Sequence, residues 1–151
     1  MLKAGDTAPE FSAPSHTGAR VALSDFRGKK VLLWFYPEAD TPGCSLEGRG
    51  FRDHQEYYDA CGIEVVGVSF DDVERNAAFA QKYHFQFPLL CDTDRKIALA
   101  YGACSDAKAQ HADRISFLID EEGKIACAYD AVDPRDHPAK VLADIMDADE
   151  S

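Results

Sequence analysis

The sequence predicts an α/β fold with a mixed central sheet flanked by helices, as a single domain over residues 1–151. Short apolar runs alternate with segments of helical periodicity, which is the pattern of parallel strands joined by helices. Two apolar runs near the C-terminal end are separated only by a Gly-containing turn, which predicts an antiparallel hairpin. No repeat, linker or low-complexity segment interrupts this alternation.

The strands are predicted from apolar runs that end at turn residues. Residues 11–26 predict a short N-terminal hairpin that turns at Thr17 and Gly18. A continuous apolar run ended by Pro37 is typical of a strand buried on both faces. The predicted parallel strands cover residues 29–37, 63–70 and 87–92, and the C-terminal hairpin covers residues 114–120 and 125–130.

Helical patterns fill the intervals between these strands. Asp71 and Asp72 suit the N-terminal cap of one helix, and Gly62 and Gly102 end two others. The predicted helices cover residues 44–61, 71–85, 95–102 and 136–146. The acidic tail, residues 147–151, is expected to fray.

Composition excludes several classes of partner. A formal net charge of −11 argues against nucleic acid and anionic membranes, which both need clustered Lys and Arg. The longest apolar run, residues 31–36, is too short to span a bilayer, and the first residues lack an apolar signal core. The five cysteines are odd in number and widely spaced, which suits a reducing compartment better than a disulfide-linked scaffold. We therefore expect a cytoplasmic protein.

The predicted topology brings distant residues to one edge of the sheet. Open α/β sheets place their ligand sites at the carboxyl ends of the parallel strands. Cys44 follows the first buried strand and Cys91 ends the third, so both are expected at this edge. Arg114 begins a strand that runs the opposite way, so it starts there too, and Cys104 lies in the loop before it. These residues form the candidate site.

Cys44 stands at the start of a predicted helix, where backbone N–H groups and the helix dipole favour a thiolate. A fast reaction also needs groups that orient the substrate and stabilise a leaving oxygen. Thr41 offers a hydroxyl, Gly43 and Cys44 offer backbone N–H groups, and Arg114 offers a positively charged fork. Each feature alone is also common in purely structural roles, so their convergence carries the prediction.

Other chemistries have weaker support in the sequence. A disulfide reductase normally needs Cys-x-x-Cys, and no pair of cysteines has that spacing. Cys61 is expected at the opposite edge of the sheet and Cys127 within a strand. The stretch 91–96 lacks the Gly and Glu spacing of a calcium loop, and the histidines are too scattered for a metal site: His16, His54, His84, His111 and His137.

Pro37, Thr41 and Cys44 form a Pro-x-x-x-Thr-x-x-Cys pattern, which resembles the active-site signature of peroxiredoxins. The stretch FYPEADTPGCSLEGRGFRD, residues 35–53, is similar to the Q-type, or bacterioferritin-comigratory, subfamily of the alkyl hydroperoxide reductase/thiol-specific antioxidant family. The resemblance extends over residues 4–14, 23–37, 65–72, 87–92 and 114–120. It implies a thioredoxin-like fold with an N-terminal β-hairpin extension.

The resemblance also implies roles for individual residues. Cys44 would be the peroxidatic cysteine, which attacks the terminal peroxide oxygen and becomes a sulfenic acid. Thr41 would hydrogen-bond the peroxide, and Pro37 would shield the sulfenate from further oxidation. Arg114 would hold thiolate and peroxide together, and Glu47 matches an acidic position that helps to fix an arginine.

The implied activity is thiol-dependent reduction of hydrogen peroxide and organic hydroperoxides, with no metal or organic cofactor. The implied reductants are thioredoxin, glutaredoxin or a small thiol, and the chain would act as a monomer or homodimer. The alternative is a non-enzymatic peroxide sensor or redox relay that uses the same Cys44. Turnover separates these two functions, because their residues would be the same.

Two departures from the subfamily concern the recycling of the sulfenic acid. Arg49 and Ala80 occupy the two usual positions of a resolving cysteine, and the loop between Gly102 and Arg114 is short. We therefore expect an external thiol to resolve Cys44. Should an internal partner exist, topology favours the remaining cysteines near the site, Cys104 and then Cys91.

Overall fold

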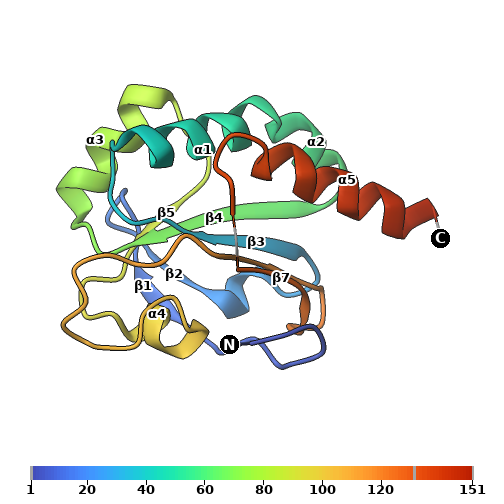
Figure 1. Ribbon diagram of the computed structural model, residues 1–151, viewed down its shortest axis with the longest axis horizontal. Helices are drawn as coiled ribbons and strands as arrows, with labels where there is room; N and C mark the ends of the chain where they lie inside the picture. The colour runs from blue at the N-terminus through green and yellow to red at the C-terminus, as the bar shows by residue number, and fades with distance from the viewer. Residues whose placement is uncertain (1, 131, 151) are drawn as a thin grey trace.

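The computed structural model describes residues 2–130 and 132–150, the last five of them by their backbone alone. Within these residues a five-stranded mixed sheet has the order β5-β4-β3-β6-β7, and a separate two-stranded hairpin lies near the N-terminus. Helices cover both faces of the sheet, with α1, α2, α3 and α5 on one side and α4 on the other (Figure 1). The predicted fold class and mixed sheet are confirmed.

The central sheet is formed by β3 (Lys30–Phe35), β4 (Ile63–Ser69), β5 (Leu89–Cys91), β6 (Ser116–Ile119) and β7 (Ile125–Tyr129). Strands β3, β4 and β5 are parallel, whereas β6 and β7 are antiparallel to their neighbours. The N-terminal hairpin consists of β1 (Ser12–Pro14) and β2 (Arg20–Ala22). The helices are α1 (Pro42–Asp53), α2 (Gln55–Ala60), α3 (Val73–Tyr83), α4 (Lys96–Tyr101), α5 (His137–Glu150) and the short 3₁₀ helix η1 (Leu23–Phe26).

Strand β3 separates the hydrophobic core into two parts, because its side chains alternate between the faces of the sheet. Val31, Leu33 and Phe35 pack in the cluster that contains Tyr101 of α4. Leu32 and Trp34, which alternate with them, pack in the cluster that contains Phe51 of α1, as does Tyr36 directly after the strand. Because both faces are covered, β3 is apolar from Val31 to Phe35, as expected for a central strand.

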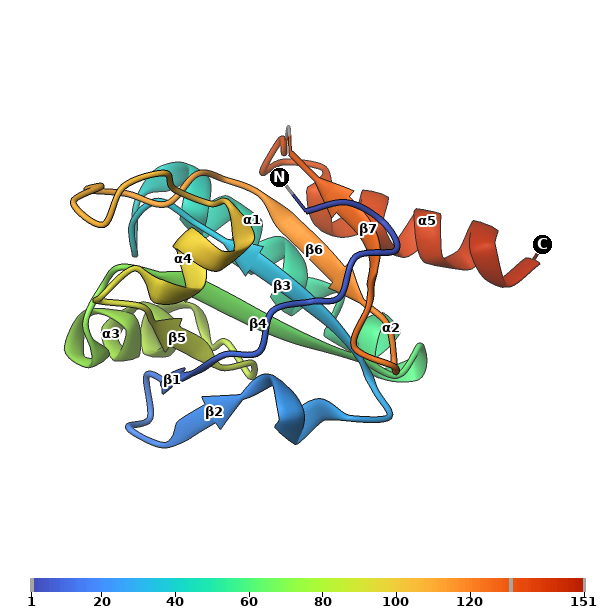
Figure 2. The same cartoon turned by 90° about the horizontal axis from the view of Figure 1, so that it is seen from below.

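The N-terminal segment crosses the sheet from β7 toward β5 (Figure 2). The N–H of Gly5 donates to the carbonyl of Ile125, and that of His16 donates to the carbonyl of Leu89. The segment and the hairpin that follows it therefore cover the face opposite α1.

The single helix predicted over residues 44–61 is wrong in its extent, because α1 begins at Pro42 and the helix is broken at His54. At His54 ψ is 12°, outside the helical range. The Gly50 carbonyl accepts the His54 N–H at 3.1 Å, and the His54 ring nitrogen Nδ1 lies 2.8 Å from the same oxygen. The backbone and the ring of His54 therefore share one carbonyl at the break between α1 and α2.

The last helix is longer than the sequence indicates. Helix α5 continues to Glu150 and so includes residues 147–150 of the predicted tail, while residue 151 lies outside the described part. Among the described residues, no helix combines the length and the apolar character that a membrane span requires.

Candidate active site

The connection between β3 and α1 carries the peroxiredoxin-like signature. Thr41 is the N-cap of α1, with the extended backbone angles φ −87° and ψ 156° that a cap residue adopts. Pro42 is the first helical residue, where its missing N–H costs no hydrogen bond. The Ser45 N–H donates to the Thr41 carbonyl at 2.8 Å, so the N–H groups of Gly43 and Cys44 precede the first intrahelical bond. Cys44 is fully buried in this first turn.

Arg114 reaches this turn from the opposite direction. Strand β6 pairs antiparallel with β3, and the Phe35 N–H donates to the Ile115 carbonyl at 2.9 Å, which places Arg114 beside the end of β3. Its Nη2 lies 3.6 Å from the Cys44 sulfur, and its Nη1 donates to Glu47 Oε1 at 2.9 Å. The planar guanidinium therefore connects the thiol with a carboxylate one turn further along α1.

Glu47 is completely buried although it is a carboxylate. Burial raises the pKa of Glu47 to about 7, against the opposing effect of the hydrogen bond from Arg114. Its second oxygen, Oε2, has no hydrogen-bond partner among the described residues. A Cys44 thiolate and an ionised Glu47 would thus compete for one guanidinium, because both face Arg114.

Gly43 has a steric role that the sequence did not indicate. A Cβ at this position would lie 2.8 Å from Arg114 Nη2 and 3.8 Å from Pro134 Cγ. Only glycine leaves room for the guanidinium over the first turn of α1. The sequence had suggested Gly43 solely as a backbone donor, since a contact with a residue so distant in the chain leaves no local pattern.

Thr41 and Pro37 lie in the connection itself. The Thr41 hydroxyl donates to the Glu38 carbonyl at 2.8 Å and makes no capping hydrogen bond to α1. Its oxygen can therefore still accept a hydrogen bond from a substrate. Pro37 ends the extended segment after β3, and its carbonyl lies 3.3 Å from His111 Nδ1.

The other cysteines lie in different surroundings. All five cysteines fall within residues 2–130 and are free thiols. Cys91 ends β5, is buried, and accepts a hydrogen bond of 3.4 Å from Asn76 Nδ2. Cys104 packs against the core cluster on the face of the sheet opposite Cys44. Burial raises the pKa of both the Cys91 and the Cys104 thiols, which lowers the fraction of each that is present as the reactive thiolate.

The remaining cysteines and the two usual resolving positions contribute no further thiol to the site. Cys61 lies two residues before the start of β4, and Cys127 pairs with Leu118 within β7. Arg49 is exposed on α1, and Ala80 is buried in α3. The described residues contain no group of three or more His, Cys, Asp or Glu side chains that could hold a metal ion.

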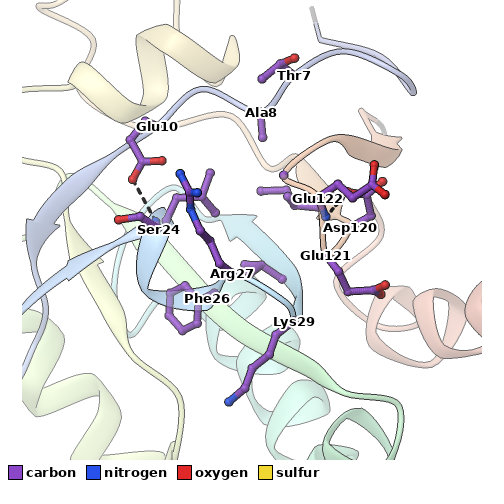
Figure 3. Close-up of a pocket in the computed structure, with 14 residues that line it drawn as sticks. Thr7, Ala8, Glu10, Ser24, Phe26, Arg27, Lys29, Asp120, Glu121 and Glu122 are labelled. Carbon is purple, nitrogen blue, oxygen red and sulfur yellow. Dashed lines mark hydrogen bonds between the residues drawn. The ribbon is translucent and has the colours of Figure 1, made fainter.

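A cavity of about 320 Å³ lies at the opposite edge of the sheet (Figure 3). Arg27 and Lys29 line one side of it, and the acidic turn between β6 and β7, residues 120–122, lines another. Its lining includes neither a cysteine nor any residue of the β3–α1 connection. It is therefore separate from the candidate site.

Comparisons with known proteins agree with this arrangement. A family model described as the AhpC/TSA family matches residues 4–128. The chain is 40% identical over 146 residues to Peroxiredoxin Bcp of Escherichia coli, covering 93% of this chain and 94% of that protein. The crystal structure of Peroxidoxin BcpB from Mycobacterium tuberculosis superposes with a TM-score of 0.90 at 32% identity, covering 97% of this chain and 98% of the other.

A third comparison concerns the bacterioferritin comigratory protein of Xanthomonas campestris. Its structure superposes with a TM-score of 0.85 at 27% identity, and the match covers 91% of each chain. These similarities confirm the thioredoxin-like fold expected from the resemblance. The family match spans most of the chain, so this protein belongs to the AhpC/TSA family and is a peroxiredoxin.

Proposed function

We propose that Cys44 is the peroxidatic residue of this thiol-dependent peroxidase. One observation carries the assignment: the Cys44 sulfur is buried in the first turn of α1 with Arg114 Nη2 at 3.6 Å. A positive charge and a helix N-terminus both stabilise a thiolate, and the thiolate is the form of cysteine that reacts.

The reaction is a two-electron transfer. The Cys44 thiolate attacks the terminal oxygen of a hydroperoxide ROOH, the S–O bond forms and the O–O bond breaks. The sulfur is oxidised to a sulfenic acid, and the leaving RO⁻ takes up a proton and departs as ROH. The donors that surround the sulfur would stabilise the charge on the leaving oxygen: Arg114 and the N–H groups of Gly43 and Cys44.

Thr41 would hold the peroxide in line for this attack. Because its proton is donated to the Glu38 carbonyl, its oxygen is free to accept the O–H of a bound hydroperoxide. Pro37, which has no N–H, would limit access of further peroxide to the sulfenate. Glu47 would keep the Arg114 fork in a single orientation through its hydrogen bond of 2.9 Å.

The proposed substrates are hydrogen peroxide and organic hydroperoxides. Alkyl peroxide reduction is described for the related protein of Xanthomonas campestris. An external thiol, from thioredoxin, glutaredoxin or a small molecule, would attack the sulfenic acid and release water to form a mixed disulfide. A second thiol would then restore Cys44. We further propose that residues 1–151 form one domain that acts in the cytoplasm as a monomer or homodimer.

Peroxide consumption with a thiol reductant in excess tests this function. The wild-type protein should consume many equivalents of peroxide, and Cys44→Ser should consume none, because a serine hydroxyl is not appreciably ionised near neutral pH. Cys127→Ser, which removes a thiol within β7, is the matched control and should turn over normally. Peroxide consumption by the Cys44→Ser variant at the wild-type rate would refute the assignment. Consumption of a single equivalent without turnover would instead favour a peroxide sensor.

A further inference from the structure

Asp71 connects the end of β4 with the loop that carries the active-site signature. Its side chain is almost completely buried, and Oδ2 accepts two hydrogen bonds of 2.8 Å, from the Ala39 N–H and from Ser69 Oγ. The cap of α3 is the neighbouring Asp72, which accepts the Arg75 N–H. Asp71 is therefore not needed to begin the helix, and its carboxylate is turned toward the active-site loop.

The peptide group that Asp71 binds is the one that also orients Thr41. The Ala39 N–H and the Glu38 carbonyl belong to the same peptide unit, and that carbonyl accepts the Thr41 hydroxyl at 2.8 Å. A trans peptide is planar, so its N–H and C=O point in opposite directions. An acceptor that fixes the N–H therefore also fixes the direction of the carbonyl. A charged acceptor polarises the peptide as well, which strengthens the bond that the carbonyl accepts.

The contacts that Glu38 and Asp40 of this loop make with α3 are more exposed. Asp40 binds Lys82 and Tyr83 at the surface, and Glu38 lies 3.7 Å from Arg75. Exposed ion pairs of this kind contribute little to stability, because water screens the attraction between the charges. The buried carboxylate of Asp71 makes the contact that is shielded from water.

The orientation of Asp71 is itself supported by a buried polar network. Ser69 Oγ donates to Asp71, and Asn76 Nδ2 lies 3.3 Å from the same Ser69 oxygen. Asn76 Oδ1 in turn accepts the Tyr36 hydroxyl at 2.6 Å. Tyr36 directly precedes Pro37, so the network begins and ends in the active-site connection. Such a network holds its members in one arrangement when each polar group is satisfied.

We propose that Asp71 is a positioning residue for peroxide reduction, which orients the Thr41 hydroxyl through the peptide group between Glu38 and Ala39. This inference rests on the proposed function of Cys44. Asp71 keeps the Thr41 proton directed to the Glu38 carbonyl, so that the Thr41 oxygen faces the substrate as an acceptor. Without the carboxylate the peptide can rotate, and the hydroxyl loses its single orientation.

A double-mutant cycle tests the proposal, with the rate of Cys44 oxidation by hydrogen peroxide as the measurement. Asp71→Asn should slow this rate about tenfold, because a charge-assisted hydrogen bond becomes a neutral one. Thr41→Val removes the hydroxyl at nearly constant shape and should also slow oxidation. If Asp71 acts through Thr41, the double variant is no slower than Thr41→Val alone. Independent, additive losses would overturn the proposal.

A second readout separates positioning from ionisation. The pH profile of Cys44 alkylation by iodoacetamide should be the same in Asp71→Asn as in the wild-type protein, because Arg114 and the start of α1 are unchanged. A shifted profile that accounted for the slower oxidation would overturn the proposal. Ser69→Ala, which loosens Asp71 but keeps its charge, should slow oxidation less, and only while Thr41 is present. This variant tests the proposal even if Asp71→Asn folds poorly.

Asp72→Asn is the matched control, since it changes the same residue type one position along at the cap of α3. In this variant Cys44 should be oxidised at the wild-type rate. A decrease in that rate equal to the decrease in Asp71→Asn would refute a specific role for Asp71. If the wild-type protein turns over peroxide and Asp71→Asn oxidises Cys44 at the wild-type rate, only the inference about Asp71 is refuted. If the wild-type protein consumes no peroxide, the proposed function itself is refuted.

Discussion

Arg114 Nη2 lies 3.6 Å from the Cys44 sulfur, although 70 residues separate the two in the sequence. The other arm of the same guanidinium donates to Glu47, which is buried on the helix that carries Cys44. One rigid cation is thus shared between the reactive sulfur and a buried carboxylate. Changes at any of these three residues should therefore be detected at the other two.

Arg114→Ala should slow the oxidation of Cys44 about 100- to 1000-fold, the typical cost of removing a positioned donor from such a site. The loss should persist at about pH 10.5, two units above the ordinary cysteine pKa of about 8.5, because Arg114 also binds the peroxide. Arg114→Lys should recover only part of the rate, since a single ammonium cannot contact sulfur and substrate as a fork. Stopped-flow rates against pH provide the measurement. Full recovery of the alanine variant at high pH would show that Arg114 acts on ionisation alone.

Gly43→Ala should slow peroxide reduction without unfolding the protein. The added Cβ would lie 2.8 Å from Arg114 Nη2, so the guanidinium must move away from the sulfur. Alanine is otherwise favourable in a helix, so thermal stability should be nearly unchanged. Gly50→Ala on the same helix is the control: its Cβ would meet Pro138 Cγ at 2.7 Å, which should lower the melting temperature and spare the rate. A wild-type rate in Gly43→Ala would contradict the steric role.

Glu47 should make the protein less stable as the pH rises. Its pKa is raised by burial from 4.5 to about 7, so between these values the native state binds a proton that the unfolded state has lost. The free energy of unfolding should therefore fall across this window by about 3 kcal/mol. Glu47→Gln lacks this dependence and should gain stability relative to the wild type at pH 8 compared with pH 4.5.

Urea unfolding at the two pH values measures this difference. Glu56→Gln, at an exposed position on α2, is the control and should change stability equally at both. The interpretation of Glu47 fails if the stability difference between wild type and Glu47→Gln is also the same at pH 4.5 and pH 8.

One equivalent of peroxide without reductant should leave Cys44 as a sulfenic acid or its over-oxidised products, with no internal crosslink. Strand β4 lies between β5 and β3, so Cys91 in β5 lies about 10 Å from β3, the strand that leads to Cys44. A disulfide needs Cα atoms within about 7 Å of each other. Cys104 packs on the opposite face of the sheet. Mass spectrometry of the oxidised protein decides the outcome.

A Cys44–Cys104 or Cys44–Cys91 disulfide in that experiment would overturn external resolution. Cys91→Ser and Cys104→Ser should turn over at the wild-type rate when a thiol reductant is present. A crosslink to Cys61 would contradict the position of that residue before β4.

The sequence by itself determined the features that depend on local spacing. The apolar run of β3 predicted a strand buried on both faces, and its side chains alternate between two core clusters. Pro37, Thr41 and Cys44 lie within eight residues, so their pattern could be recognised before any contact was known. Arg114 could be placed near Cys44 because the direction of a strand determines at which edge of the sheet it begins.

Only the tertiary structure decided which side chains meet at that edge. Asp71 and Asp72 are equally suited to cap α3 in the sequence, and packing assigns the cap to Asp72 and turns Asp71 toward Ala39. The contact between Gly43 and Arg114 likewise leaves no periodic signal. The physical reason is that periodicity reports which face of an element is buried, whereas the orientation of a polar side chain depends on partners brought together by the whole fold.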